Sequence, residues 1–226
     1  MKQKNTILHT ILTVVLFGAI WGLLEATIGY LLHWLPSMVS GLVMFPIGAT
    51  LMYWAFRNTD KKTVILYVGL IAAAIKAINL LMPLPPAGPI KVINPMISIV
   101  LQSLIVFGLS YLFDRKTTAV KSTLLQVGIL AFAIVAWRGL FLVNQAINYG
   151  ITGNLPNQLK DAAGILSFIF VNGGYEFLIL GVIYAIYRLV SFFLAHKGIT
   201  IKGPEWIMYV LSPLALVGAV LAVVIR

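Results

Sequence analysis

Seven long apolar segments, separated by short polar connections, dominate the pattern of the chain. They cover residues 7–33, 38–56, 63–82, 93–113, 121–148, 162–190 and 206–225. Each has about the 20 residues that a helix needs to cross a bilayer. The segments are continuously apolar rather than alternating, which favours helices that satisfy their backbone hydrogen bonds internally. The pattern therefore predicts an all-α polytopic membrane protein, a bundle of about seven transmembrane helices.

Composition supports the same class of protein. Of the 226 residues, 61% are hydrophobic and only 10% are charged, whereas a soluble domain carries about 25% charged residues. The net charge of +10 does not indicate nucleic-acid binding, because the basic residues lie mostly in short loops, where they set topology and meet anionic lipid. The chain has no cysteine, which excludes disulfides and thiolate metal sites.

The basic residues are concentrated on one side of the predicted membrane. They precede the first segment and follow the second, fourth and sixth: Lys2, Lys4, Arg57, Lys61, Lys62, Arg115, Lys116, Lys121, Arg188, Lys197 and Lys202. The other side carries Lys91, Lys160 and Arg226. The positive-inside rule then predicts a cytoplasmic N-terminus and an external C-terminus in the cell (plasma) membrane.

The first segment combines small residues with an acid. Gly18, Gly22 and Ala26 recur every fourth residue, a spacing that lets another helix approach closely, either within the bundle or from a partner. Glu25 lies in the same segment. A carboxylate at membrane depth costs several kcal/mol unless it is paired or faces water. Glu25 therefore indicates either a functional site or a structural ion pair.

Polar residues gather in the predicted outer parts of several segments. Two acids, Glu25 and Glu176, and two bases, Lys76 and Arg138, would be near neutral together. The same depth holds His33, Asn79, Asn94, Asn144, Gln145, Asn148, Asn172 and Tyr175. A single amide in a membrane helix more often joins two helices than binds a ligand. Their clustering by depth, however, predicts a substrate-binding pocket that opens to the outside.

Motifs for catalysis or metal binding are missing from the sequence. It contains no H-E-x-x-H and no P-loop, and six acidic residues provide no acid-rich motif for Mg²⁺ and diphosphate. We expect a protein that is not an enzyme, with no catalytic residues, no metal and no cofactor.

The small-residue stripe and the depth-biased polar set resemble the substrate-binding S component of an energy-coupling factor (ECF) transporter. In that family about six helices bind a vitamin or a metal ion from outside, and small-residue faces dock onto a transmembrane coupling subunit that two ATPase subunits drive. The resemblance covers residues 7–190. It implies that Gly18, Gly22 and Ala26 dock the partner. Residue 2 is Lys, not the His of the nickel and cobalt members, which favours a vitamin or vitamin precursor.

The resemblance also implies a division of the chain. Residues 1–190 would form the six-helix substrate-binding core, residues 191–205 a basic cytoplasmic linker, and residues 206–226 an additional transmembrane helix. Two other functions fit the same sequence. One is a stand-alone proton-coupled secondary transporter, with Glu25 and Glu176 as the titrating groups. The other is a non-transporting membrane protein that uses the stripe as an assembly surface.

Overall fold

The computed structural model describes residues 7–32, 39–81, 88–111 and 123–196, and every regular element within these ranges is a helix. In chain order the elements are α1 (Ile7–Leu32), α2 (Val39–Thr59), α3 (Thr63–Ala77), η1 (Ile78–Leu81), α4 (Ile90–Ser110), α5 (Thr123–Thr152), η3 (Asn157–Leu159), α6 (Ala162–Leu166), η4 (Ser167–Val171) and α7 (Asn172–His196). The six spans predicted within residues 7–190 each coincide with a helix or a run of helices.

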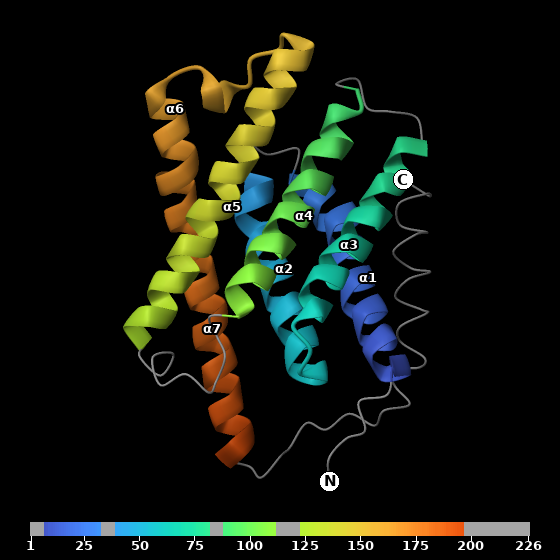
Figure 1. Cartoon of the computed structure of the whole chain (residues 1–226). Helices are drawn as coiled ribbons and strands as arrows, with labels where there is room; N and C mark the ends of the chain where they lie inside the picture. The colour runs from blue at the N-terminus through green and yellow to red at the C-terminus, as the bar shows by residue number, and fades with distance from the viewer. Residues whose placement is uncertain (1–6, 33–38, 82–87, 112–122, 197–226) are drawn as a thin grey trace.

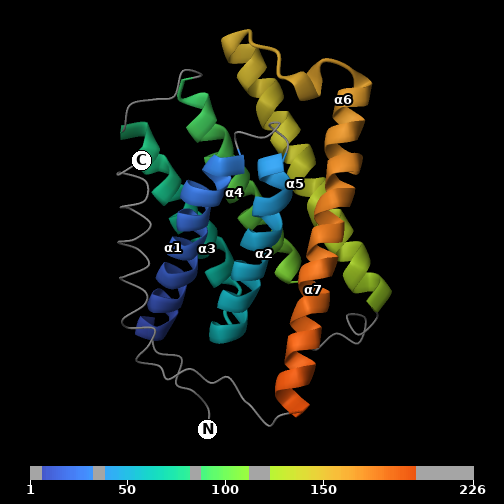
Figure 2. The same cartoon turned by 180° about the vertical axis from the view of Figure 1, so that it is seen from behind.

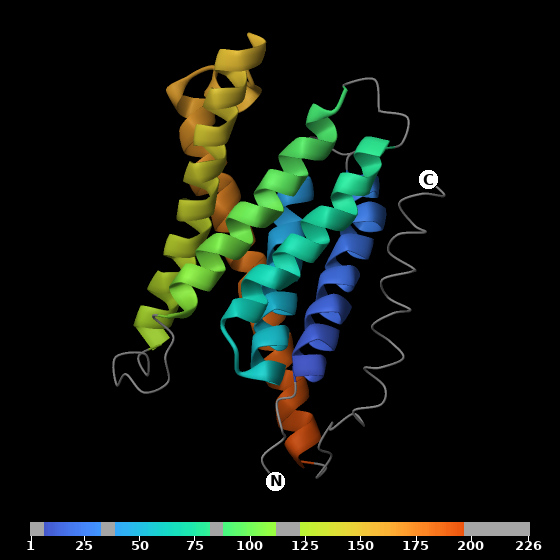
Figure 3. The same cartoon turned by 45° about the vertical axis from the view of Figure 1, so that its right-hand side comes forward.

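The helices form an up-and-down bundle (Figure 1). Helix α3 packs most extensively on α1 and α4. Seen from behind, α2 lies between α1 and α7 (Figure 2), and it contacts both. Figure 3 shows α3 and α4 side by side, with α5 beyond α4. The C-terminal ends of α1, α3 and α5 thus lie at one end of the bundle, and those of α2 and α4 lie at the other.

Five helical segments among the described residues are long and apolar enough to cross a membrane. They are Ile7–Thr27, Thr63–Leu81, Ile90–Ser110, Val127–Thr152 and Ala162–Ile186. The prediction of an all-helical protein is confirmed for the described residues, and the five segments agree with a multi-pass membrane protein. The number of seven spans and the cytoplasmic N-terminus stay predictions. The linker predicted for residues 191–205 is described only as far as His196, where α7 ends. The additional helix predicted for residues 206–226 lies outside the described residues.

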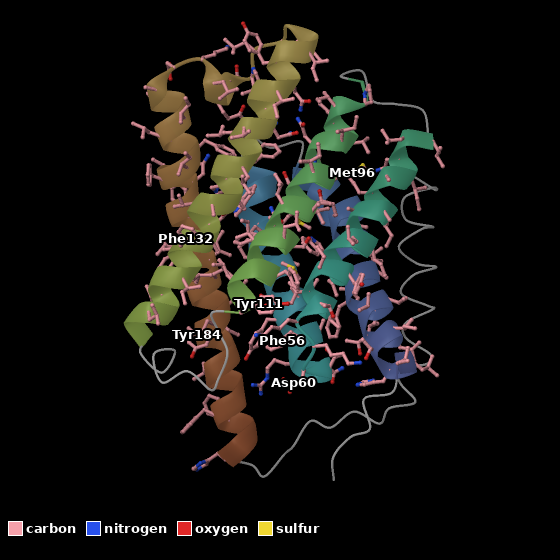
Figure 4. The ribbon with its side chains drawn as sticks, in the orientation of Figure 1. Phe56, Asp60, Met96, Tyr111, Phe132 and Tyr184 are labelled. Atoms are coloured by element: carbon pink, nitrogen blue, oxygen red, sulfur yellow. The ribbon has the colours of Figure 1, made fainter. Side chains whose placement is uncertain are left out.

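Large apolar side chains cover the outside of the bundle as well as its interior. Phe132 on α5 is 60% exposed and Tyr184 on α7 is 59% exposed, and both project away from the neighbouring helices (Figure 4). Inside, one cluster is centred on Trp21, Met52 and Val68, between α1, α2 and α3. Apolar side chains on both surfaces of a helix are expected where lipid replaces water as the solvent.

The turn between α2 and α3 is short because Asp60 adopts a left-handed conformation. Its φ is +56°, and its backbone N–H donates to the carbonyl oxygen of Phe56 at 2.7 Å. Many helices end at a residue in this left-handed conformation. Glycine is the most common residue there, and Asp is among the few others that tolerate it. Thr63 then starts α3 only three residues later.

The small-residue stripe of α1 faces α3. A Cβ atom added at Gly18 would lie 2.7 Å from Cβ of Ile71, and one added at Gly22 would lie 2.7 Å from Cδ1 of Ile75. Ala26 is 2% exposed and packs in the same cluster as Ile75. The prediction that this stripe docks a partner subunit is therefore corrected, since α3 covers it. The spacing of small residues indicates a close helix contact but does not say which helix makes it.

Candidate functional site

A cavity of about 280 Å³ lies among α1, α2, α4, α5, η3 and η4. Its polar lining consists of Glu25, Lys91, Asn94, Ser98, Gln102, Arg138, Gln145 and Gln158, and its aromatic lining of Trp21, Trp137, Phe141 and Phe168. Lys91 is exposed and lies in the first turn of α4, whereas Arg138 is 2% exposed. The cavity therefore extends from the buried centre of the bundle towards the end at which α4 begins, near the top of Figure 1.

Glu25 is the acid in the cavity wall, and it faces a lysine of α3. Its carboxylate Oε1 lies 3.9 Å from Nζ of Lys76, and both side chains are 4% exposed. The distance is an ion-pair contact that is too long for a direct hydrogen bond. Lys76 sits behind the wall and does not line the cavity itself. Charge at this depth is thus compensated across α1 and α3, as a buried carboxylate requires.

Arg138 is held by Glu176 in a bidentate ion pair. Arg138 Nε donates to Glu176 Oε2 at 3.1 Å, and Nη2 donates to Oε1 at 2.8 Å. Trp137 Nε1 also donates to Oε2, at 3.3 Å. Glu176 is fully buried and Arg138 nearly so. This planar fork geometry is the strongest arrangement available to an arginine and a carboxylate, and it joins α5 to α7.

A π-helical turn supplies the third partner of Arg138. Nη1 donates at 2.6 Å to the carbonyl oxygen of Phe168, which lies in η4, a π-helix between α6 and α7. In a π-turn the backbone hydrogen bonds join residues i and i+5, so the regular α-helical hydrogen bonding is interrupted. Such turns are frequent at functional sites. The sixth predicted span was expected to be one regular helix. The structure places a π-turn in it at the level of the cavity.

Aromatic rings form the apolar part of the wall. The ring centroids of Phe141 and Phe168 are 6.0 Å apart with a stacked arrangement, and those of Trp137 and Phe141 are 6.3 Å apart. The guanidinium of Arg138 lies 4.7 Å from the ring centroid of Phe168 and 5.0 Å from that of Trp137. These contacts fix the orientation of the rings and surround the arginine with π-faces that favour a cation.

Two polar groups of the cavity-lining residues are buried without a hydrogen-bond partner among the described residues. They are the indole Nε1 of Trp21 and the amide Oδ1 of Asn94. Trp21 is fully buried. A buried donor or acceptor that is left unpaired costs about 1–3 kcal/mol, so native structures rarely contain one without a reason. Among the described residues, one unpaired donor and one unpaired acceptor therefore lie inside the cavity wall, and neither atom is exposed.

Ten of the twelve predicted substrate-binding residues fall into three groups. Glu25, Asn94, Arg138 and Gln145 line the cavity, and Lys76 and Glu176 stand behind two of them as ion-pair partners. The amides predicted alongside them do not line it: Asn79, Asn144, Asn148 and Asn172. His33 lies outside the described residues.

Tyr175 was predicted to line the substrate pocket, but the structure does not place it at the cavity. It is 54% exposed and does not line the cavity, although its neighbour Glu176 is fully buried. The physical reason is that adjacent residues of a helix point about 100° apart. Depth in the membrane therefore does not decide which residue faces the interior.

Several cavity residues were missing from the predicted set. Gln102 is 3% exposed and lines the cavity two turns after Asn94, at a spacing that keeps both on one broad face of α4. Trp21 lies one turn before Glu25, so the helical period could have indicated it. The aromatic wall gave no such signal, because an aromatic residue in an apolar helix is indistinguishable from ordinary core.

The chain matches no protein-family model, no curated protein and no solved structure.

Proposed function

We propose that this chain is a membrane-embedded substrate-capture protein, which binds a small molecule in the cavity between α1, α4 and α5. The observation that carries the proposal is the convergence of Glu25, Asn94, Gln102, Arg138 and Gln145 on one concave space of about 280 Å³. Ligand sites combine an apolar, aromatic lining with a few directed polar groups, and this cavity has that composition. It lies towards the end of the bundle whose connections carry few basic residues, which supports entry from outside the cell.

Dependence on partners is part of the same proposal. As an S component would, the chain captures a vitamin or vitamin precursor and relies on a transmembrane coupling subunit and two ATPase subunits for release to the cytoplasm. This part rests on the resemblance and on the cavity. The stripe of α1 no longer contributes to it, since Gly18 and Gly22 are in contact with α3. A partner would have to dock on another face of the bundle.

The capture step can be tested on the purified protein by native mass spectrometry in a mild detergent. We expect a bound small molecule that is lost when the cavity is filled by Ser98→Phe, because Ser98 lines it. Leu104→Phe is the matched control, since Leu104 lies on the same helix, is 44% exposed and does not line the cavity. A ligand that both variants retain would place its site elsewhere, and no ligand in the parent protein would favour an assembly protein.

A stand-alone proton-coupled transporter is the second candidate. Glu25 favours it, because this acid lines the cavity, is 3% exposed and has its nearest lysine nitrogen at 3.9 Å. The two functions differ in what the chain does alone in liposomes. Capture without accumulation supports the S-component proposal. Accumulation that follows an imposed proton gradient, and that Glu25→Gln abolishes, supports the transporter.

A further inference from the structure

Glu25 lines the cavity with a carboxylate that accepts no hydrogen bond from the described residues. Nζ of Lys76 lies 3.9 Å from its Oε1, which is beyond hydrogen-bonding distance. Its two oxygens are nevertheless not among the polar atoms that the described part of the chain buries without a partner. Both oxygens are therefore open to the space that the residue lines. An ionised carboxylate can accept about four hydrogen bonds, so these sites are left to the contents of the cavity.

Helix α4 turns neutral polar side chains towards the same space. Ser98 and Gln102 lie four residues apart and both line the cavity, as residues on one face of a helix do. Elsewhere in α4 the hydroxyls of Ser103 and Ser110 donate to backbone carbonyls one turn earlier, at 2.9 and 2.6 Å. Neither the Ser98 hydroxyl nor the Gln102 amide has a hydrogen-bond partner among the described residues, and neither is sealed in the wall. Both groups are therefore available to a ligand.

Helix α5 contributes a third uncommitted amide and a committed cation. Gln145 is 6% exposed and lines the cavity, and within the described ranges its amide has no partner and is not sealed in the wall. Arg138, in contrast, uses three of its five N–H donors on Glu176 and the Phe168 carbonyl. An anionic ligand would have to displace Glu176 from this bidentate pair. The buried part of the cavity therefore does not favour an anion.

The charge of Glu25 limits the ligand in the opposite direction. Lys76 already compensates this carboxylate from behind the wall, so a cationic ligand would leave one buried positive charge in excess, which is costly. Lys91 is the cation at the mouth, in the first turn of α4, and it is exposed. The cavity therefore presents hydrogen-bond acceptors inside, at Glu25, and a positive charge at its entrance.

We infer that the cavity selects a net-neutral polar molecule that enters with its hydrogen-bond donors first. Two neighbouring N–H or O–H groups of this molecule donate to the carboxylate of Glu25, and an acceptor group lies towards Lys91. The amides of Gln102 and Gln145 bind the polar groups between these two ends. This inference rests on the proposed function and specifies its substrate class. The volume of about 280 Å³, at the lower end of the range for ligand pockets, limits the molecule to a small size.

The test uses the purified full-length chain and the low-molecular-weight fraction of yeast extract as the probe. The immobilised protein is incubated with this mixture and washed, and the retained compounds are identified by mass spectrometry. Their N–H and O–H groups are counted from the mass shift in deuterated water, and their net charge at neutral pH is measured by electrophoresis.

Two variants remove the inferred contacts separately. Glu25→Gln combined with Lys76→Met keeps the shape of the acid, replaces one acceptor oxygen by a donor, and orphans no charge of this pair. Gln102→Leu removes one amide from the opposite wall. Thr27→Val is the control, because Thr27 lies on the same helix as Glu25, is exposed and does not line the cavity.

We expect a net-neutral compound with at least two exchangeable hydrogens, retained about tenfold less by the paired variant and by Gln102→Leu, and equally by the control. Each variant leaves a polar group of the compound buried and unpaired. Melting temperatures of the same samples separate this loss from unfolding; if the paired variant does not fold, Gln102→Leu decides by the same criterion.

Three results would overturn the inference and leave the proposed function standing. They are a retained compound with a net charge, a compound with fewer than two exchangeable hydrogens, and a compound that the folded variants hold as tightly as the parent chain does. Retention of nothing by the parent chain overturns both proposals.

Discussion

The ion pair between Arg138 and Glu176 should be the most sensitive polar contact for folding. Replacing Glu176 by Gln keeps the shape of the side chain but removes the charge that compensates Arg138. Arg138 is 2% exposed, so it cannot recover hydration, and its remaining partners would be two neutral acceptors, the Phe168 carbonyl and the new amide oxygen. Removal of one member of a buried pair typically costs about 3–5 kcal/mol. We therefore expect Glu176→Gln to lower the free energy of unfolding by about this amount.

A double-mutant cycle, with Arg138→Met and Glu176→Leu measured singly and together, separates the penalty of the orphaned charge from the net value of the pair. The double variant Arg138→Met with Glu176→Leu removes both charges and keeps apolar volume. It should recover most of the loss, because replacing a buried pair with packed apolar residues is often close to neutral. Asp60→Asn is the control, since Asp60 is exposed and Asn tolerates the same left-handed backbone. We expect it to change the stability by less than about 0.5 kcal/mol.

The assay is reversible unfolding in mixed micelles, followed by tryptophan fluorescence, with size-exclusion chromatography of each variant. If Glu176→Gln costs less than about 1 kcal/mol, water must reach Arg138, because only solvation can replace the lost carboxylate at so little cost. The pair would then belong to the open cavity and not to the structural wall. A double variant that is as unstable as the single one would refute the argument that the orphaned charge dominates.

Three further outcomes follow from the packing and the topology. Gly22→Leu should destabilise the protein by about 1–3 kcal/mol in a thermal unfolding assay, because its first added carbon would already lie 2.7 Å from Ile75; Ile75→Ala should restore part of the loss. Gly48→Ala should displace the ring of Trp21 and reduce ligand retention, whereas unchanged retention would mean that the ring can shift freely. Asn154→Cys introduces the only thiol into a chain without cysteine, and an impermeant maleimide should label it in intact cells; labelling only after lysis would reverse the predicted orientation.

The sequence by itself determined the helical class of the protein and the positions of its helices between residues 7 and 190. The bilayer explains this success, since continuous apolar segments must satisfy their own backbone hydrogen bonds and so become helices. It also indicated Glu25, Asn94, Arg138 and Gln145 as cavity residues, because polar groups at membrane depth are costly and are retained only where they have a use. The predicted orientation also comes from the sequence alone, because the basic residues are concentrated in the loops on one side of the predicted membrane.

Only the tertiary structure decided which face of each helix meets which neighbour. It placed α3 on the small-residue stripe, turned Tyr175 outwards, and put Glu176 behind the cavity wall instead of in it. It also added Trp21 to the residues that line the cavity and placed a π-turn that contains Phe168 between α6 and α7. The physical reason is that hydropathy fixes the depth of a residue along a helix, whereas its direction depends on the rotation of that helix about its axis. This rotation is set by side-chain packing between segments far apart in the chain.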